Sequence, residues 1–274
     1  MSQTQPDSTS VAPTPAGAPN SAAAAPRRGR SRRRKAAYAV LVVLLLAIVG
    51  AIGYFAIPQP NLPEASAALV STPMVRFARE DGRLVFAPAS GAPTTGFVFY
   101  PGGKVDPAAY APSAAAIAAR GYLVEIVPMP LNLAVLGFEG ATPAMAAHPE
   151  IRHWAIGGHS LGGAMAAQYL SGHPGAAEGL IFWAAYSATD ISTQPIRVLI
   201  AYGSLDAGVA SYAGPKALAN IPATPVVLVI QGGNHEQMGW YTGQPNDPPA
   251  TISRADQQAK VVDATAALLE SLGR

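Results

Sequence analysis

The pattern of hydrophobic and polar positions separates an N-terminal region from a longer body. Residues 1–26 consist mainly of Ser, Pro, Ala, Gln and Thr, with no large apolar side chain except Met1 and Val11. Such a composition cannot bury enough surface to offset its ordering entropy, so we expect disorder there. A basic cluster follows, and residues 36–57 then run without a charge. At about 1.5 Å per residue this run is long enough for a transmembrane helix.

Beyond a Pro/Ala/Ser-rich linker at 58–72, short apolar runs alternate with helical patterns. The apolar runs are continuous rather than alternating, which indicates strands covered on both faces. We therefore expect an α/β fold over 73–274, with a mostly parallel central sheet and helices on both faces. Expected strands lie at 74–78, 84–87, 96–100, 122–127, 153–156, 180–185, 197–202 and 226–230, the first two forming a hairpin. Expected helices lie at 109–119, at 131–147 with interruptions, at the segment ending at 170, and at 255–272.

Composition removes several chemistries. The chain has no cysteine, which excludes disulfides, thiolate catalysis, Cys-based zinc sites and iron–sulfur clusters. We expect neither a cofactor nor a metal. The net charge of +2 is the sum of +6 in residues 1–35 (seven bases, one acid) and −4 in the remainder (11 bases, 15 acids). A basic tail on a mildly acidic body points to a polyanionic partner for the tail.

The basic cluster lies on the N-terminal side of the apolar run. The positive-inside rule then keeps residues 1–35 in the cytoplasm as a basic tail and places the body outside the cytoplasm. Tyr38, Tyr54 and Phe55 stand near the ends of the run, as interfacial aromatics do, and Pro58 stops the helix. We favour an uncleaved signal anchor in the cell membrane.

Three other interpretations of the N-terminal region stay open. A signal peptide cleaved at Ala65-Ser66-Ala67 is the main rival, although the apolar run is longer than a usual signal-peptide core. A buried core helix and nucleic-acid binding by the Arg cluster are weaker interpretations, because a spanning helix accounts for both the apolar run and the adjacent basic cluster. We expect no nucleic-acid partner, and the sequence does not indicate an oligomeric state.

The strongest chemical signal is Gly158-His159-Ser160-Leu161-Gly162, between an expected strand and an expected helix. In a G-x-S-x-G turn the serine is a nucleophile, and the flanking glycines let backbones pass closely. Its hydroxyl needs a base, and the base needs an orienting acid. His235 and Asp206 each follow an expected strand, in the order Ser, acid, His. Asp190 is the reserve acid.

An oxyanion hole requires two backbone N–H groups. We expect one from Leu161, after the nucleophile, and one from the loop after the strand at 96–100, where Gly103 is the first choice and Lys104 the second. Lys104 could instead pair with Asp106 at the loop rim. Expected pocket residues are Lys104, Met129, Leu131, Met238 and Trp240, which could equally be core or rim packing.

Three parts of the sequence resemble the α/β-hydrolase superfamily, specifically α/β-hydrolase family 5 near the dienelactone-hydrolase-like proteins. They are the G-x-S-x-G turn, the Asp206 and His235 that follow it, and the stretch Phe99-Tyr100-Pro101-Gly102-Gly103-Lys104-Val105-Asp106. The resemblance covers about residues 73–273. It implies a sheet of eight or slightly fewer strands and a Ser160–Asp206–His235 triad. Dienelactone hydrolases use a Cys nucleophile, so their substrate does not carry over.

The expected function is a membrane-anchored serine hydrolase that cleaves carboxylic esters, thioesters or lipid esters through an acyl-enzyme. The segment between the strands at 180–185 and 197–202 is too short for a large cap domain. Peptidase or amidase activity stays open, because a triad does not select the leaving group. The alternatives from other classes are a non-catalytic binding or scaffold protein on a hydrolase fold, and a polyanion-binding role of the Arg-rich tail.

Overall fold

The computed structural model describes residues 28–274, so the disorder predicted for residues 1–26 lies outside the described part of the chain. The chain divides into two compact units after Ile48, within helix α1 (Arg28–Ala56). This helix begins eight residues earlier than the predicted start at 36, because Arg and Lys are good helix formers and extend it through the basic cluster. Its stretch Arg34–Ala56 is long and apolar enough to be a signal sequence or a membrane anchor.

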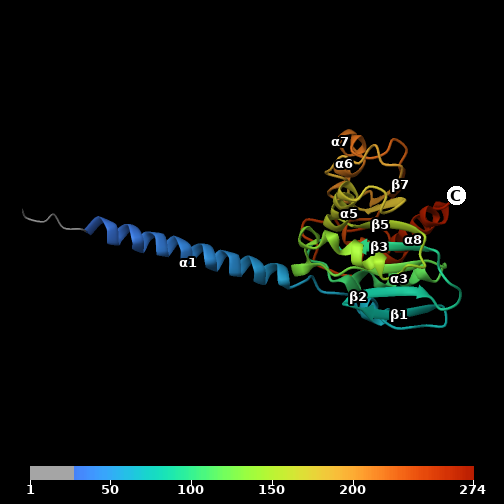
Figure 1. The fold of residues 1–274 in the computed structure, drawn as a ribbon, viewed down its shortest axis with the longest axis horizontal. Helices are drawn as coiled ribbons and strands as arrows, with labels where there is room; N and C mark the ends of the chain where they lie inside the picture. The colour runs from blue at the N-terminus through green and yellow to red at the C-terminus, as the bar shows by residue number, and fades with distance from the viewer. Residues whose placement is uncertain (1–27) are drawn as a thin grey trace, which may run out of the picture. The chain divides into compact units, whose positions relative to one another are not determined.

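The body is built on one eight-stranded sheet with the order β1-β2-β4-β3-β5-β6-β7-β8 (Figure 1). Strands β3 to β8 run parallel, and the β1–β2 hairpin adds two antiparallel strands at one edge. This agrees with the expected mostly parallel sheet. The strands are β1 (Val75–Glu80), β2 (Arg83–Pro88), β3 (Thr95–Tyr100), β4 (Leu123–Ile126), β5 (His153–His159), β6 (Gly179–Trp183), β7 (Arg197–Gly203) and β8 (Val226–Ile230).

Helices cover both faces of the sheet. The β3–α3–β4 crossover and the β5–α5–β6 crossover move in opposite directions along the sheet, so right-handed connections put α3 (Ala111–Ala118) and α5 (Leu161–Gly172) on opposite faces. The closing helix α8 (Arg254–Ser271) packs on α3, β6 and β7. The central strands are therefore buried on both sides, whereas β8 is an exposed edge strand.

The structure departs from the predicted helices in two ways. The interrupted helix expected at 131–147 is three 3₁₀ turns, η2 (Pro130–Asn132), η3 (Ala134–Leu136) and η4 (Phe138–Gly140), followed by α4 (Ala141–Ala146). Gly137 and Gly140 stand at these breaks, where a continuous helix would lose stability. Five further elements had no prediction: η1 (Pro107–Tyr110), which leads into α3, the short helices α2 (Pro63–Ala67), α6 (Val209–Tyr212) and α7 (Pro215–Ala219), and the turn η5 (Glu236–Met238).

Residues 58–62, which we call the strap, are bound to the body rather than forming the expected free linker. The Gln59 N–H donates to the Lys104 carbonyl at 2.8 Å, and the Leu62 N–H donates to the Trp240 carbonyl at 2.9 Å. The Thr242 N–H in turn donates to the Pro60 carbonyl at 2.9 Å. The strap therefore joins the loop after β3 to the loop after β8.

Helix α2 (Pro63–Ala67) continues from the strap and buries Ala65 completely. It packs on η1 and α3. The Ala65-Ser66-Ala67 sequence is thus part of the folded body, with its first residue inaccessible to solvent. This environment differs from the extended, exposed segment that a signal-peptide cleavage site requires.

A backbone test isolates the strap. Leu62 has φ −77° and ψ 157°, which proline adopts without strain, so Leu62→Pro removes the N–H bond to Trp240 and the leucine side chain. Leu62→Ala removes the side chain alone. We expect Leu62→Pro to be less stable than Leu62→Ala by about 1 kcal/mol, the net contribution of one hydrogen bond. Urea unfolding of both full-length variants in detergent measures this difference. Equal stabilities would show that the bond contributes no more than the restriction that proline places on the unfolded chain.

Candidate active site

Ser160 stands on the turn between β5 and α5, with φ 52° and ψ −121°. A non-glycine residue in this region of positive φ is strained, and such strain collects at functional sites. The strand before it and the helix after it are those expected from the sequence. The turn therefore presents the serine at the carboxyl edge of the sheet.

The glycines around Ser160 are required by a close passage of two backbone segments. A Cβ on Gly162 would lie 2.1 Å from the Tyr100 carbonyl oxygen, and a Cβ on Gly158 would lie 2.3 Å from the same atom. Only residues without a side chain fit at this separation. The end of β3 and the serine turn are consequently held against each other.

His235 and Asp206 lie together at the same edge of the sheet. His235 Nδ1 is 2.7 Å from Asp206 Oδ2, and the Asp206 side chain is almost fully buried. The reserve acid, Asp190, is exposed and accepts hydrogen bonds from the backbone and hydroxyl of Ser192, which lower the pKa of its carboxyl. The structure thus pairs His235 with Asp206 and leaves Asp190 apart from it.

Tyr212, on α6, joins this pair, and sequence analysis did not single it out. Its hydroxyl donates to Asp206 Oδ1 at 2.9 Å, and its oxygen lies 3.2 Å from His235 Nδ1. The Gly208 N–H also donates to Asp206 Oδ1, at 2.7 Å. Burial, followed by the charge of Asp206, raises the pKa of Tyr212, so the hydroxyl stays protonated as a donor. Asp206 is therefore fixed by three donors.

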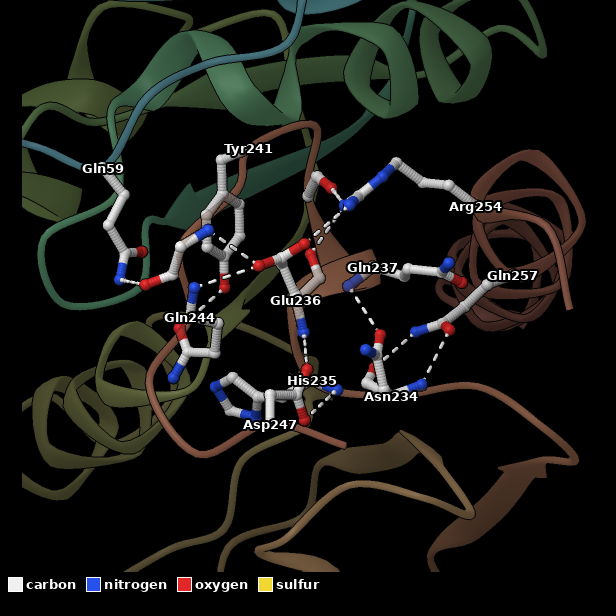
Figure 2. Close-up of polar contacts among 12 residues, drawn as sticks. Gln59, Asn234, His235, Glu236, Gln237, Tyr241, Gln244, Asp247, Arg254 and Gln257 are labelled. Atoms are coloured by element: carbon white, nitrogen blue, oxygen red, sulfur yellow. Dashed lines mark hydrogen bonds and ion pairs between the residues drawn. The ribbon is translucent and has the colours of Figure 1, made fainter. Parts of the chain in front are cut away.

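The loop that carries His235 is held by polar contacts on every side (Figure 2). The backbone N–H groups of His235 and Glu236 donate to Asp247 at 3.1 and 2.7 Å. Gln257, fully buried on α8, donates to the Asn234 carbonyl and accepts from the Asn234 N–H (Figure 2). Asp247 lies twelve residues after the histidine in a Pro-rich loop, and nothing in the sequence pattern marked it.

Two backbone N–H groups near Ser160 are free to bind an anion. In the described part of the chain, neither the Leu161 N–H nor the Gly103 N–H donates a hydrogen bond to the protein. A Cβ on Gly103 would lie 3.5 Å from the Leu161 side chain, so the two residues are close neighbours. The Lys104 N–H, the second choice from sequence, is already bonded to the Asn132 carbonyl at 2.9 Å.

His159, beside Ser160 in sequence, links the serine turn to the loop after β3. The Gly102 N–H donates to the Tyr110 hydroxyl at 3.0 Å, and this hydroxyl lies 2.8 Å from His159 Nδ1. Because the Tyr110 oxygen accepts from Gly102, its proton is directed to His159 Nδ1. The His159 ring is fully buried against the His235 ring, with centroids 4.4 Å apart. Burial lowers the pKa of His159 well below 6.5, so the imidazole is neutral.

A cavity of about 330 Å³ opens at Ser160. This is within the volume range of small-molecule sites. None of its lining side chains is charged, and most are small and apolar. They are Ser160, Leu161, Ala164, Ala184, Ala185, Tyr186, Ala188, Gly208, Ser211 and Tyr212.

The cavity differs from the pocket expected from sequence. It opens between the loops after β5, β6 and β7, so Lys104, Met129, Leu131, Met238 and Trp240 are not among its lining residues. Met129 and Met238 are buried in the core, which matches the packing role left open for them. Within residues 28–274, no group of His, Asp and Glu side chains forms a cluster that could hold a metal ion.

Comparison with known proteins agrees with this architecture. Residues 96–259 match the alpha/beta hydrolase family. The chain belongs to the alpha/beta hydrolase family. The comparison with curated proteins found no match. Membership of the alpha/beta hydrolase family confirms the resemblance drawn from the serine turn and suggests a hydrolase.

The buried His159 makes the stability of this hydrolase-family fold sensitive to acid. The unfolded chain binds a proton at this histidine below pH 6.5, whereas the folded protein resists it, so the free energy of unfolding falls as the pH drops below 6.5. One such proton changes the stability by up to about 1.4 kcal/mol per pH unit. We expect His159→Asn, whose side-chain oxygen can accept from Tyr110, to reduce this slope.

Urea unfolding at pH values above and below 6.5 measures the slope for each protein. His173→Asn, which makes the same substitution at a partly exposed histidine, is the matched control. An unchanged slope in His159→Asn would contradict the assignment of a neutral buried imidazole.

Proposed function

We propose that the protein is a serine hydrolase that cleaves carboxylic esters with a Ser160–His235–Asp206 triad. The observation that carries the proposal is the Asp206–His235 hydrogen bond at the edge of the sheet where Ser160 lines an uncharged cavity. Tyr212 connects the two features, because it lines the cavity and contacts both Asp206 and His235. Membership of the alpha/beta hydrolase family supports the same reaction class.

Each residue has a defined role in the proposed reaction. The Ser160 hydroxyl attacks the ester carbonyl while His235 Nε2 takes its proton. Asp206 holds the ring with Nδ1 protonated and stabilises the imidazolium that forms. The Leu161 and Gly103 N–H groups bind the oxyanion. His235 then protonates the leaving alcohol, and water releases the acid from the acyl-enzyme by the reverse use of the same groups.

The cavity at Ser160 favours an apolar acyl group. Four of its ten lining residues are alanine and none is charged, so a charged substrate group would lose its hydration without compensation. The volume of about 330 Å³ suits a small or medium acyl chain. We accordingly place carboxylic esters, thioesters and lipid esters ahead of peptides.

We further propose that α1 stays on the mature protein as a membrane anchor, with the basic tail in the cytoplasm and the catalytic domain outside it. The bonds of the strap to Lys104 and Trp240 support this, because cleavage after Ala67 would remove residues that the body has incorporated. The complete burial of Ala65 supports it as well.

The nucleophile is tested by covalent labelling. A fluorophosphonate probe should label the full-length protein in detergent, and Ser160→Ala should lose all labelling because the attacking oxygen is gone. Ser211→Ala is the matched control, since Ser211 lines the same cavity, and it should keep the labelling rate. Labelling that persists in Ser160→Ala, or is lost in Ser211→Ala, would move the nucleophile.

The acid is tested by a pair of asparagine substitutions. Asp206→Asn should lower kcat for a p-nitrophenyl ester by about 10³–10⁴-fold, because the amide favours the wrong histidine tautomer. Asp190→Asn should leave kcat unchanged, since in the described part of the chain the hydrogen bonds of the Asp190 side chain go to Ser192 and not to His235. Equal kcat values for the two variants would contradict the proposed triad.

A further inference from the structure

The edge of the sheet that carries Ser160 and His235 also carries an exposed apolar rim. We define the rim as Val135 and Leu136 after β4, Tyr186 after β6 and Val209 after β7, with exposed fractions of 45, 54, 41 and 37%. These residues come from three separate loops, and β4, β6 and β7 all run parallel to β3. Their carboxyl ends therefore meet at one edge.

The rim surrounds the candidate site rather than a remote surface. Tyr186 lines the cavity at Ser160, and Val209 follows Gly208, which lines it too. On the other side, Leu136 follows the turn whose Asn132 carbonyl accepts from the Lys104 N–H, next to Gly103. Exposed apolar side chains gathered around a site mark an interaction surface.

Chain connectivity supplies the partner. Helix α1 ends at Ala56, and Gln59 is already bonded to the Lys104 carbonyl, so three residues join the apolar helix to the loop after β3. Three extended residues span at most about 11 Å. Ile57, within this connection, is 70% exposed. The site edge is therefore the part of the body tied directly to the end of the membrane-length helix.

We propose that this rim rests on the surface of a lipid bilayer and that the substrate is an ester taken from that bilayer. Interfacial binding needs apolar side chains that enter the headgroup region, and the rim provides four of them beside the mouth of the cavity. The choice of a lipid-borne ester depends on the proposed serine-hydrolase function. Contact of the rim with the bilayer does not; it rests on the proposed anchor and on the exposed side chains.

The absence of cysteine allows a direct test of the contact. Leu136→Cys and the control Val226→Cys are each labelled with an environment-sensitive fluorophore on the full-length protein. Val226 is 63% exposed and begins β8, so it lies where the amino ends of the parallel strands meet, away from the carboxyl ends that carry the site. The proteins are placed in phosphatidylcholine vesicles with the body outside, with and without lipids spin-labelled near the headgroup. We expect a blue shift and quenching at position 136 and neither at 226.

Equal quenching at the two positions, or none at 136, would overturn the rim as a membrane contact whether or not the protein is an esterase. A second measurement tests the source of the substrate. Replacing Val135 and Leu136 by Ser should lower kcat/KM for a vesicle-borne ester and leave kcat/KM for water-soluble p-nitrophenyl acetate unchanged, and Val226→Ser should change neither. An equal fall in kcat/KM for both esters would overturn the claim that the substrate comes from the bilayer. If the unmodified protein hydrolysed neither ester, the proposed function would be overturned instead.

Discussion

The contact of the Tyr100 carbonyl with Gly158 and Gly162 is the constraint on which the rest of the site depends. Because no side chain fits between these backbones, the end of β3 is pressed against the serine turn. This holds Ser160 in its strained conformation and places Gly103 beside Leu161. Ser160 and the N–H groups of Leu161 and Gly103 are thereby brought together by main-chain packing in the core of the sheet, before any side-chain contact is made.

Around this contact, the polar side chains act in linked sets rather than singly. Tyr212 and the Gly208 N–H fix Asp206, and Asp206 orients His235. The His159 ring lies beside the His235 ring. Tyr110 holds His159 through its hydroxyl, which also accepts from the Gly102 N–H. A change at Tyr110 would therefore affect both the loop after β3 and the surroundings of the histidine. The neutral state of His159 matters here, because a positive charge on His159 would oppose the formation of a positive charge on the neighbouring His235.

The sequence predicts most of the fold because the relevant signals are local. Continuous apolar runs mark β3 to β8, and the glycine pattern marks the serine turn, so Ser160, Asp206 and His235 could be selected by their position after strands. The contacts of Tyr212 and Asp247 could not, because they depend on the irregular path of the loops that follow Asp206 and His235. The contact of Tyr110 with His159 joins residues 49 positions apart, and no local pattern marks it. The lining of the cavity at Ser160 likewise differs from the pocket residues expected from the sequence. Its alanines carry no chemical signal, whereas the bulky Met129 and Met238 attract attention and are core residues.

The strap changes where this enzyme-like body should be considered to begin. The family match covers residues 96–259, yet hydrogen bonds to the loops around the site start at Phe55, whose carbonyl accepts from Asn132 Nδ2 at 3.0 Å, and continue at Gln59 in the strap. Helix α8 continues to Ser271, with Leu268 and Leu269 buried in the core. A shortened protein cut at the limits of the match would lack the β1–β2 hairpin, the support under the Lys104 and Trp240 loops, and the last three turns of the closing helix. The smallest unit able to keep its shape therefore runs from the end of the apolar helix to the end of α8, and the end of α1, our proposed membrane anchor, belongs to the architecture of the body itself.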